Sequence, residues 1–126
     1  YDEFITFNGR GFDVPYMMIR SAIHGVRAQR NLMDDRYLNP RFDNKARHID
    51  LYDQLKFYGG FRGAHMSLHF LCKAFGITSP KDGETDGSDV GALFKAGEYE
   101  KIARYNAGDL HATRQLYLYW DKYLRF

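Results

Sequence analysis

Residues 5–13 read ITFNGRGFD, and this stretch combines the signals of a strand, a turn and the beginning of a helix. Residues 4–7 are β-branched or aromatic and are followed by Asn-Gly, which predicts a buried strand that ends in a turn. Asp13 is a suitable N-cap and Pro15 fits the first helical turn, so we expect a helix to follow as far as about Arg30. Glycines at such a junction let backbone N–H groups approach a polyanion closely.

The composition indicates a globular chain with room for one domain over residues 1–126. It is 44% hydrophobic, 27% charged and 17% aromatic, and a domain of this size buries roughly two thirds of the surface that its unfolded chain exposes. The net charge of +2 provides no basic arm of the kind that grips duplex DNA non-specifically. Any contact with nucleic acid is therefore expected to be local.

Location is predicted from what the sequence lacks. No apolar run is long enough to cross a bilayer, and the start, YDEFITF, has neither the basic region nor the apolar region of a signal peptide. Cys72 is the single cysteine, which excludes an internal disulfide and fits a reducing compartment. These features predict a cytoplasmic protein without a membrane partner.

The remaining sequence predicts further elements of an α/β chain without an internal repeat. Ser67 and Gly76 bracket an apolar helical pattern as N-cap and C′ residue. Asp50 lies at the end of a strand candidate, where a structural role is favoured over a role close to the site. The predicted elements are a surface loop over 31–45, a strand over 48–51, a helical piece over 52–57, a helix over 68–75, turns over 79–88, a short helix over 88–97 and a last helix or broken helix pair over 99–124.

Two acidic residues far apart in the sequence are candidates for one site. Tyr105 and Asp109 are separated by one helical turn and share a face, which continues through Ala112, Leu116, Trp120 and Tyr123. Cleavage of a phosphodiester with two metal ions needs several acidic ligands. Asp13 and Asp109 are two such candidates, and an exposed Phe12 would stack on a terminal base.

In these motifs the chain resembles a DEDD-type 3′→5′ exonuclease of the DnaQ-like superfamily. It is most similar to stand-alone proteins related to the proofreading domain of family B DNA polymerases. Asn8, three further residues and Phe12-Asp13 match the second motif of that family. Tyr105, three residues and Asp109 match the third motif, and the tyrosine is typical of the DEDDy subclass. The matches that follow in family order are HIDL at 48–51, SLHFLCKAFGI at 67–77 and the Asp-Gly segments at 81–90.

The resemblance implies a fold, a reaction and a set of residues. The fold would be RNase H-like, with a mixed sheet flanked by helices. Asp13 and Asp109 would bind two divalent ions, Mg²⁺ or Mn²⁺, and Tyr105 would orient the attacking water. The substrate would be a single-stranded or frayed 3′ end of DNA, with RNA possible. The residues implied to contact it are Asn8, Arg10, Phe12 and Lys81.

One departure from the family pattern leaves an alternative open. The first motif of the family, an Asp-x-Glu on the central strand, should lie well before Asn8, and only seven residues precede it here. We therefore expect this chain to represent the helix-rich C-terminal part of such a domain. The alternatives to a DNA exonuclease are a catalytically inactive module that binds single-stranded nucleic acid and an exoribonuclease. A half zinc site at His65 and His69 is less favoured than surface or loop histidines.

Overall fold

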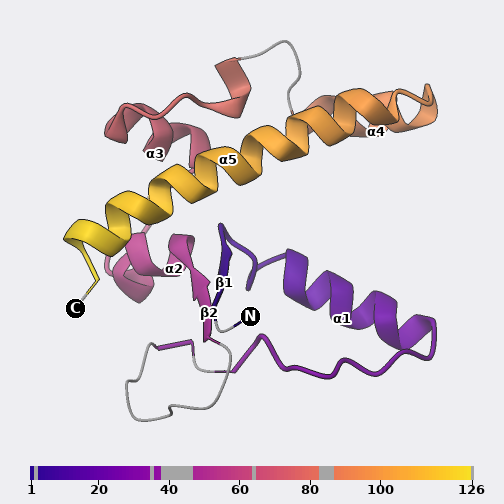
Figure 1. Ribbon diagram of the computed structural model, residues 1–126, viewed down its shortest axis with the longest axis horizontal. Coiled ribbons are helices and arrows are strands. Elements are labelled where there is room, and N and C mark those ends of the chain that lie inside the picture. The colour runs from indigo at the N-terminus through magenta and orange to yellow at the C-terminus, as the bar shows by residue number, and fades with distance from the viewer. Residues whose placement is uncertain (2, 35, 38–46, 64, 83–86, 126) are drawn as a thin grey trace. The chain divides into compact units, whose positions relative to one another are not determined.

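The computed structural model describes residues 1–126 except residues 2, 35, 38–46, 64, 83–86 and 126. The chain divides into two compact units, Tyr1–Arg62 and Gly63–Phe126. Figure 1 labels the helices and strands of both units. The prediction of one domain over residues 1–126 stays a prediction, and each unit is considered by itself.

The first unit contains a two-stranded parallel sheet. Strand β1 (Glu3–Thr6) pairs in parallel with β2 (Arg47–Asp50), so that Ile5 lies opposite Ile49 and Thr6 opposite Asp50. Both strands were predicted, with bounds shifted by one residue. The helices of this unit are α1 (Asp13–Ile23) after β1, α2 (Leu51–Leu55) directly after β2, and the short 3-10 helix η1 (Phe57–Gly59). Because parallel strands need a crossover connection, helix α1 and the segment after it join the ends of the pair.

Helix α1 ends earlier than the sequence pattern predicted. Its last residue is Ile23, whereas the apolar spacing predicted a helix as far as about Arg30. Gly25 has a φ of 68°, its N–H bonds to Ala22 O at 3.0 Å, and the N–H of Val26 bonds to Ser21 O at 2.8 Å. This pair of bonds around a left-handed glycine is a Schellman motif, which ends a helix. Val26 therefore lies beyond the helix.

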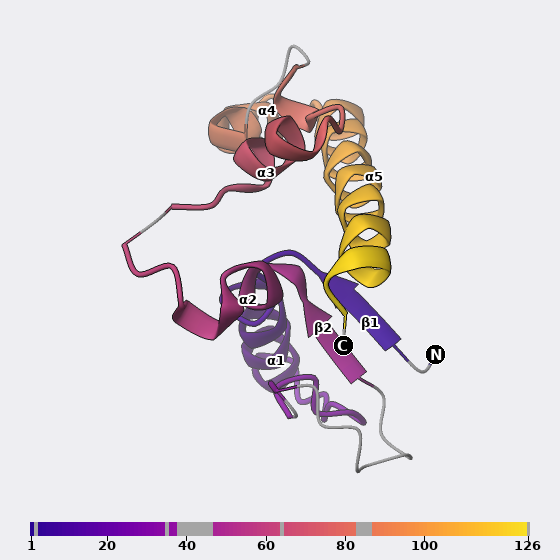
Figure 2. The same ribbon diagram turned by 90° about the vertical axis from the view of Figure 1, so that its left-hand side faces the viewer.

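The second unit is helical. It contains α3 (Leu68–Phe75), α4 (Val90–Lys95) and the long α5 (Tyr99–Tyr123), with the 3-10 helices η2 (Pro80–Asp82) and η3 (Gly87–Asp89) between α3 and α4. Both α3 and α4 pack beside α5, as Figure 2 shows. The short helix predicted over 88–97 is confirmed as α4 with tighter bounds.

The predicted caps of α3 are confirmed. The Ser67 hydroxyl accepts a hydrogen bond from the N–H of Phe70 at 3.1 Å, and Gly76 has a φ of 67°. An N-cap serine satisfies an N–H group that has no partner inside the helix, and a glycine adopts the left-handed conformation at little cost. These two residues fix the length of α3.

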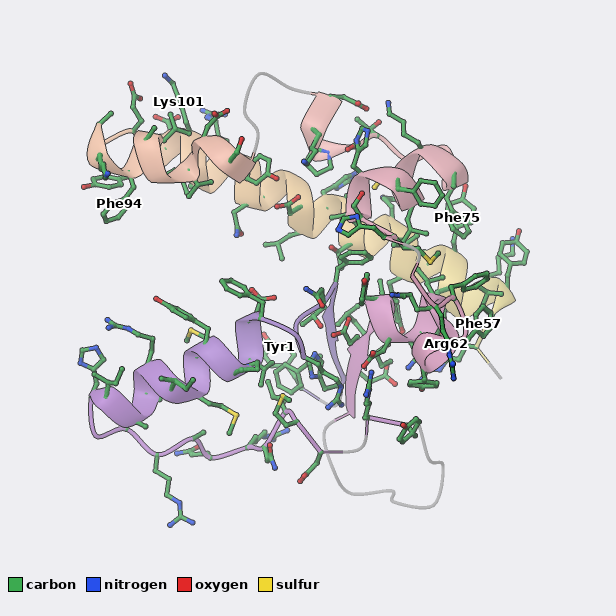
Figure 3. All side chains as sticks on the ribbon, turned by 180° about the vertical axis from the view of Figure 1, so that it is seen from behind. Tyr1, Phe57, Arg62, Phe75, Phe94 and Lys101 are labelled. Atoms are coloured by element: carbon green, nitrogen blue, oxygen red, sulfur yellow. The ribbon has the colours of Figure 1, made fainter. Side chains whose placement is uncertain are left out.

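Each unit has its own buried residues. In the second unit Leu71 and Cys72 from α3 are buried, as are Ala112, Leu116 and Trp120 on α5. Figure 3 labels Phe75 on α3 and Phe94 on α4; their rings lie 5.5 Å from Tyr119 and 5.4 Å from Tyr99. The buried face of α5 is the predicted one, except that Tyr123 is 62% exposed. In the first unit the buried side chains are Val14, His48, Ile49, Asp50, Leu51, Asp53 and Leu55.

The architecture is that of a mixed helix and strand chain with a small parallel sheet, as the α/β prediction required. The RNase H-like assignment itself stays a prediction. Among the helices that the structure describes, none has the length and apolar character needed to cross a membrane.

Candidate active site

The predicted substrate loop between β1 and α1 is a tight turn around a left-handed asparagine. Asn8 has a φ of 61°, and its carbonyl accepts hydrogen bonds from Gly11 N at 3.0 Å and Phe12 N at 3.1 Å. The carbonyl of Gly9 then accepts from Val14 N at 2.8 Å, which continues the turn into α1. Asparagine is one of the few residues besides glycine that adopts this conformation readily.

The buried carboxylate of Asp50 holds this turn from the end of β2. Its Oδ1 accepts from the backbone N–H of Asn8 at 2.7 Å, and its Oδ2 accepts from the N–H of Arg10 at 2.9 Å. The same Oδ1 accepts from Tyr52 N at 3.0 Å, which caps α2. Asp50 is 2% exposed. Asp50 is thus a structural acid, and it lies beside the candidate loop, so the two roles weighed from the sequence do not exclude each other.

A second network joins the end of β1 to β2 and to Leu32 through His48. The Thr6 hydroxyl lies 2.8 Å from His48 Nε2, and His48 Nδ1 lies 2.7 Å from the carbonyl of Leu32. Since a carbonyl only accepts, Nδ1 carries the proton and Nε2 accepts from Thr6 in the neutral ring. Burial is the main cause that lowers the pKa of His48, while the bond to Leu32 raises it.

The side chains predicted to meet the substrate and the metal point outward from this loop. Asn8, Phe12 and Asp13 are exposed, and the Phe12 ring is 64% exposed and stacks on Tyr16 at 5.9 Å between centroids. The prediction of Asp13 as N-cap is wrong, because Phe12 occupies that position and Asp13 is the first helical residue. In the first turn of α1 its negative charge meets the positive end of the helix dipole.

Arg10 turns back onto the protein. Its Nη1 donates to the carbonyl of Met33 at 2.7 Å, and its Nη2 donates to the carbonyls of Asp34 at 2.7 Å and His48 at 3.2 Å. These bonds join the turn to the chain before β2. A contact of Arg10 with nucleic acid stays a prediction, and the structure adds an anchoring role.

A hollow of about 340 Å³ lies beside the turn. An ion pair on its wall joins Arg36 to Asp53 through two bonds, from Nε to Oδ2 at 2.9 Å and from Nη2 to Oδ1 at 2.6 Å. Such two-point pairing is the geometry in which arginine binds carboxylates best. The hollow is lined by Asn8, Arg10, Gly11, Met33, Arg36, Asp50, Tyr52 and Asp53.

Tyr105 and Asp109 of the second unit lie one turn apart on α5, and both are half-buried. The Tyr105 hydroxyl lies so close to Gly87 of η3 that a Cβ there would meet it at 3.2 Å. Burial raises the pKa of Asp109, and the charge of Lys81 lowers it. The structure therefore brings Lys81, from η2, near the predicted metal ligand on the same unit.

The turn that carries Lys81 is held by residues that sequence reasoning did not select. The Ser79 hydroxyl accepts from Lys81 N at 3.2 Å and lies 2.7 Å from His69 Nδ1, while Asp82 accepts from Ser79 N at 3.2 Å. A Cβ on Gly108 would meet the Pro80 Cβ at 3.3 Å, so this glycine lets η2 approach α5. The Ser-Pro-Lys-Asp order was the available signal, since serine at a turn bonds the backbone two residues on. His69 is thereby partnered within the protein.

Across the described ranges, no three acidic, histidine or cysteine side chains gather at metal-ligand spacing. Asp13 belongs to the first unit and Asp109 to the second. A shared metal site for these two carboxylates stays a prediction.

Comparisons with known proteins add one finding. The model of a family described as "Predicted 3'-5' exonuclease related to the exonuclease domain of PolB" matches residues 1–124. Neither the curated proteins nor the solved structures gave a match.

Proposed function

Because this chain belongs to the family of predicted 3′–5′ exonucleases related to the exonuclease domain of PolB, we propose that it hydrolyses DNA from single-stranded or frayed 3′ ends. The products would be nucleoside 5′-monophosphates. The family match carries this proposal, since it spans residues 1–124 and so includes both motifs. A cytoplasmic location is part of the proposal and agrees with the free, buried thiol of Cys72.

Asp13 and Asp109 are the residues that would hold the two divalent ions, Mg²⁺ or Mn²⁺. Carboxylate oxygens are the ligands that such hard cations prefer, and the exposed Asp13 side chain is accessible to them. When bound, two ions supply a nucleophile at neutral pH and stabilise the attacking and leaving oxygens. Burial raises the pKa of the half-buried Asp109 and the charge of Lys81 offsets part of that shift. A bound cation would lower the pKa in the same direction as Lys81 and so favour the ionised carboxylate.

The substrate would be held by four side chains. Asn8 and the exposed ring of Phe12 would contact the 3′-terminal nucleotide, and stacking on such a ring accepts any base. Lys81 would bind a phosphate, and Arg10 would add a further contact to the strand. The Tyr105 hydroxyl would donate a hydrogen bond to the attacking water or accept one from it. That bond would orient the water for attack.

The test of this proposal compares two substitutions on α5 in the full-length protein. Asp109→Asn should abolish release of 5′-monophosphates from a single-stranded oligonucleotide with Mn²⁺. It should leave the melting temperature unchanged or raised, because burial already disfavours the ionised carboxylate. Glu100→Gln is the matched control, since that exposed residue pairs only with Arg104 on the helix surface among the contacts that the structure gives it. Full activity of Asp109→Asn would refute the assignment.

A second variant separates binding from chemistry at the same site. Tyr105→Phe keeps the ring and removes the hydroxyl, so it should bind the oligonucleotide normally and cleave it more slowly. One lost hydrogen bond in a transition state typically costs about a hundred- to a thousandfold in rate. Equal rates for the two proteins would exclude a role for the hydroxyl.

A catalytically inactive module that binds single strands is the second candidate. It is favoured by one observation, namely that the Phe12 ring is 64% exposed, because a base can stack on such a ring without a metal ion. Calorimetric titration with Mn²⁺ distinguishes the two. Heat from two ions supports the enzyme, whereas retained single-strand binding without metal heat supports the module. Matched DNA and RNA oligonucleotides then decide between exonuclease and exoribonuclease.

A further inference from the structure

The loop that carries the proposed nucleotide contacts has little support of its own. Asn8 has a positive φ, and the backbone–backbone bonds of the turn are internal or lead into α1, while the Arg10 side chain anchors only one of its residues. Asparagine tolerates this conformation better than most residues, but a single left-handed residue does not by itself hold a turn in one orientation. The residue that holds it here must lie elsewhere in the chain.

Asp50 lies 42 residues away from Asn8 and meets this need with both carboxylate oxygens. Oδ1 bonds the N–H of Asn8 at 2.7 Å, and Oδ2 bonds the N–H of Arg10 at 2.9 Å. These two bonds span the turn, and burial to 2% exposure excludes competing water. Hydrogen bonds to an ionised carboxylate are stronger than those between neutral groups, and the low dielectric of a buried position strengthens them.

We propose that Asp50 is a positioning residue, which fixes the turn so that Asn8, Phe12 and Asp13 face the 3′ end together. It acts through the backbone and does not touch the substrate. The inference rests on the proposed function for what the turn does, although the clamp itself is independent of it. The orientation of the motif at 8–13 therefore depends on Asp50, which lies at the end of β2 and 42 residues from Asn8 in the sequence.

Asp50→Asn is a selective test, because the two oxygens have different partners. The amide oxygen can still accept from Asn8 and Tyr52, and the cap of α2 is kept. The amide nitrogen then faces the N–H of Arg10, so two donors oppose each other and that bond is lost. Leu55→Ala is the matched control, since it opens a cavity in the same unit at a residue that is 5% exposed.

Two measurements on the full-length protein keep the clamp and the function distinguishable. Amide hydrogen exchange should be faster at Asn8 and Arg10 in Asp50→Asn than in the wild type, and unchanged there in Leu55→Ala. Affinity for a fluorescent single-stranded oligonucleotide in EDTA, below both melting transitions, should fall roughly tenfold in Asp50→Asn only.

Each other outcome identifies the part that fails. Wild-type exchange at Asn8 and Arg10 in Asp50→Asn would overturn the clamp. Faster exchange with unchanged oligonucleotide affinity would overturn the positioning role and leave the proposed function standing. An equal loss of affinity in Leu55→Ala would also overturn the positioning role, since general destabilisation would then explain the loss. A wild-type protein that neither binds nor degrades DNA would refute the proposed function, while the exchange rates would still decide on the clamp.

Discussion

At the scale of single residues, His48 should make the stability of the first unit depend on pH. Burial lowers its pKa from the ordinary 6.5, against the bond to Leu32. Arg10 lowers the pKa further, while Asp50 and Asp53 raise it. The folded protein therefore binds this proton less readily than the unfolded chain. The stabilising contribution of the neutral ring is fully present above about pH 6.5 and falls as the pH drops below it.

The prediction concerns the melting temperature between about pH 7.5 and about pH 5.5. The wild type should lose stability over this range, and His48→Asn should lose less, because asparagine keeps a donor for Leu32 and does not titrate. His24→Asn is the control at an exposed histidine of the same unit. Parallel curves for the wild type and His48→Asn would show that another group is responsible.

At the scale of elements, the glycines of the β1–α1 turn determine where Asn8 points. A Cβ on Gly11 would overlap the Asn8 side-chain amide, and a Cβ on Gly9 would overlap Thr6. Gly91 on α4 has open space around its position. Alanine at Gly9 or Gly11 would overlap a neighbouring side chain, whereas alanine at Gly91 would not. Comparing these substitutions separates steric overlap from the general effect of replacing glycine.

Gly11→Ala should lower affinity for a single-stranded oligonucleotide, because the new methyl group displaces the amide that is proposed to contact the terminal nucleotide. Gly91→Ala should bind normally and gain up to about 1 kcal/mol of stability, as expected for glycine in a helix. Affinity is measured by fluorescence anisotropy and stability by chemical denaturation. Unchanged affinity in Gly11→Ala would show that Asn8 does not contact the strand.

Local signals in the sequence predicted most elements, and their limits have physical causes. Ser67 and Gly76 were identifiable because capping depends on residue type and immediate neighbours. Helix α1 was drawn too long because Met17, Met18, Ala22 and Val26 kept a helical period, whereas Gly25 ended the helix at Ile23. Aspartate is favoured both at the N-cap and in the first helical turn, so the sequence placed the N-cap at Asp13, one residue too late.

Long-range contacts were not predictable from the sequence in the same way. Asp50 was recognised as a structural acid, but its bonds to Asn8 and Arg10 depend on the parallel register of β1 and β2. The bonds of Ser79 that hold the turn of Lys81 also depend on packing of α3 beside the next turn. Spacing along one element is encoded locally, whereas partners 40 residues apart are set by the tertiary fold.

At the scale of the whole molecule, the two proposed metal ligands come from distant parts of the chain. Asp13 lies in Tyr1–Arg62 and Asp109 in Gly63–Phe126. Ions that bind only the folded protein raise its stability in proportion to the logarithm of their concentration over the dissociation constant. A shared site and two separate sites therefore predict different effects on stability when Asp13 and Asp109 are replaced together.

We predict that Mn²⁺ raises the melting temperature of the full-length wild type and that Asp13→Ala and Asp109→Ala each reduce this gain. If both carboxylates hold the same ions, the double variant should lose little more than either single variant, because the second ligand has no site left to support. Asp121→Ala is the control, since that exposed residue of α5 pairs with Arg125. Strictly additive losses would mean that each unit binds its own ion, and the shared two-metal site would then be wrong even if both residues bind metal.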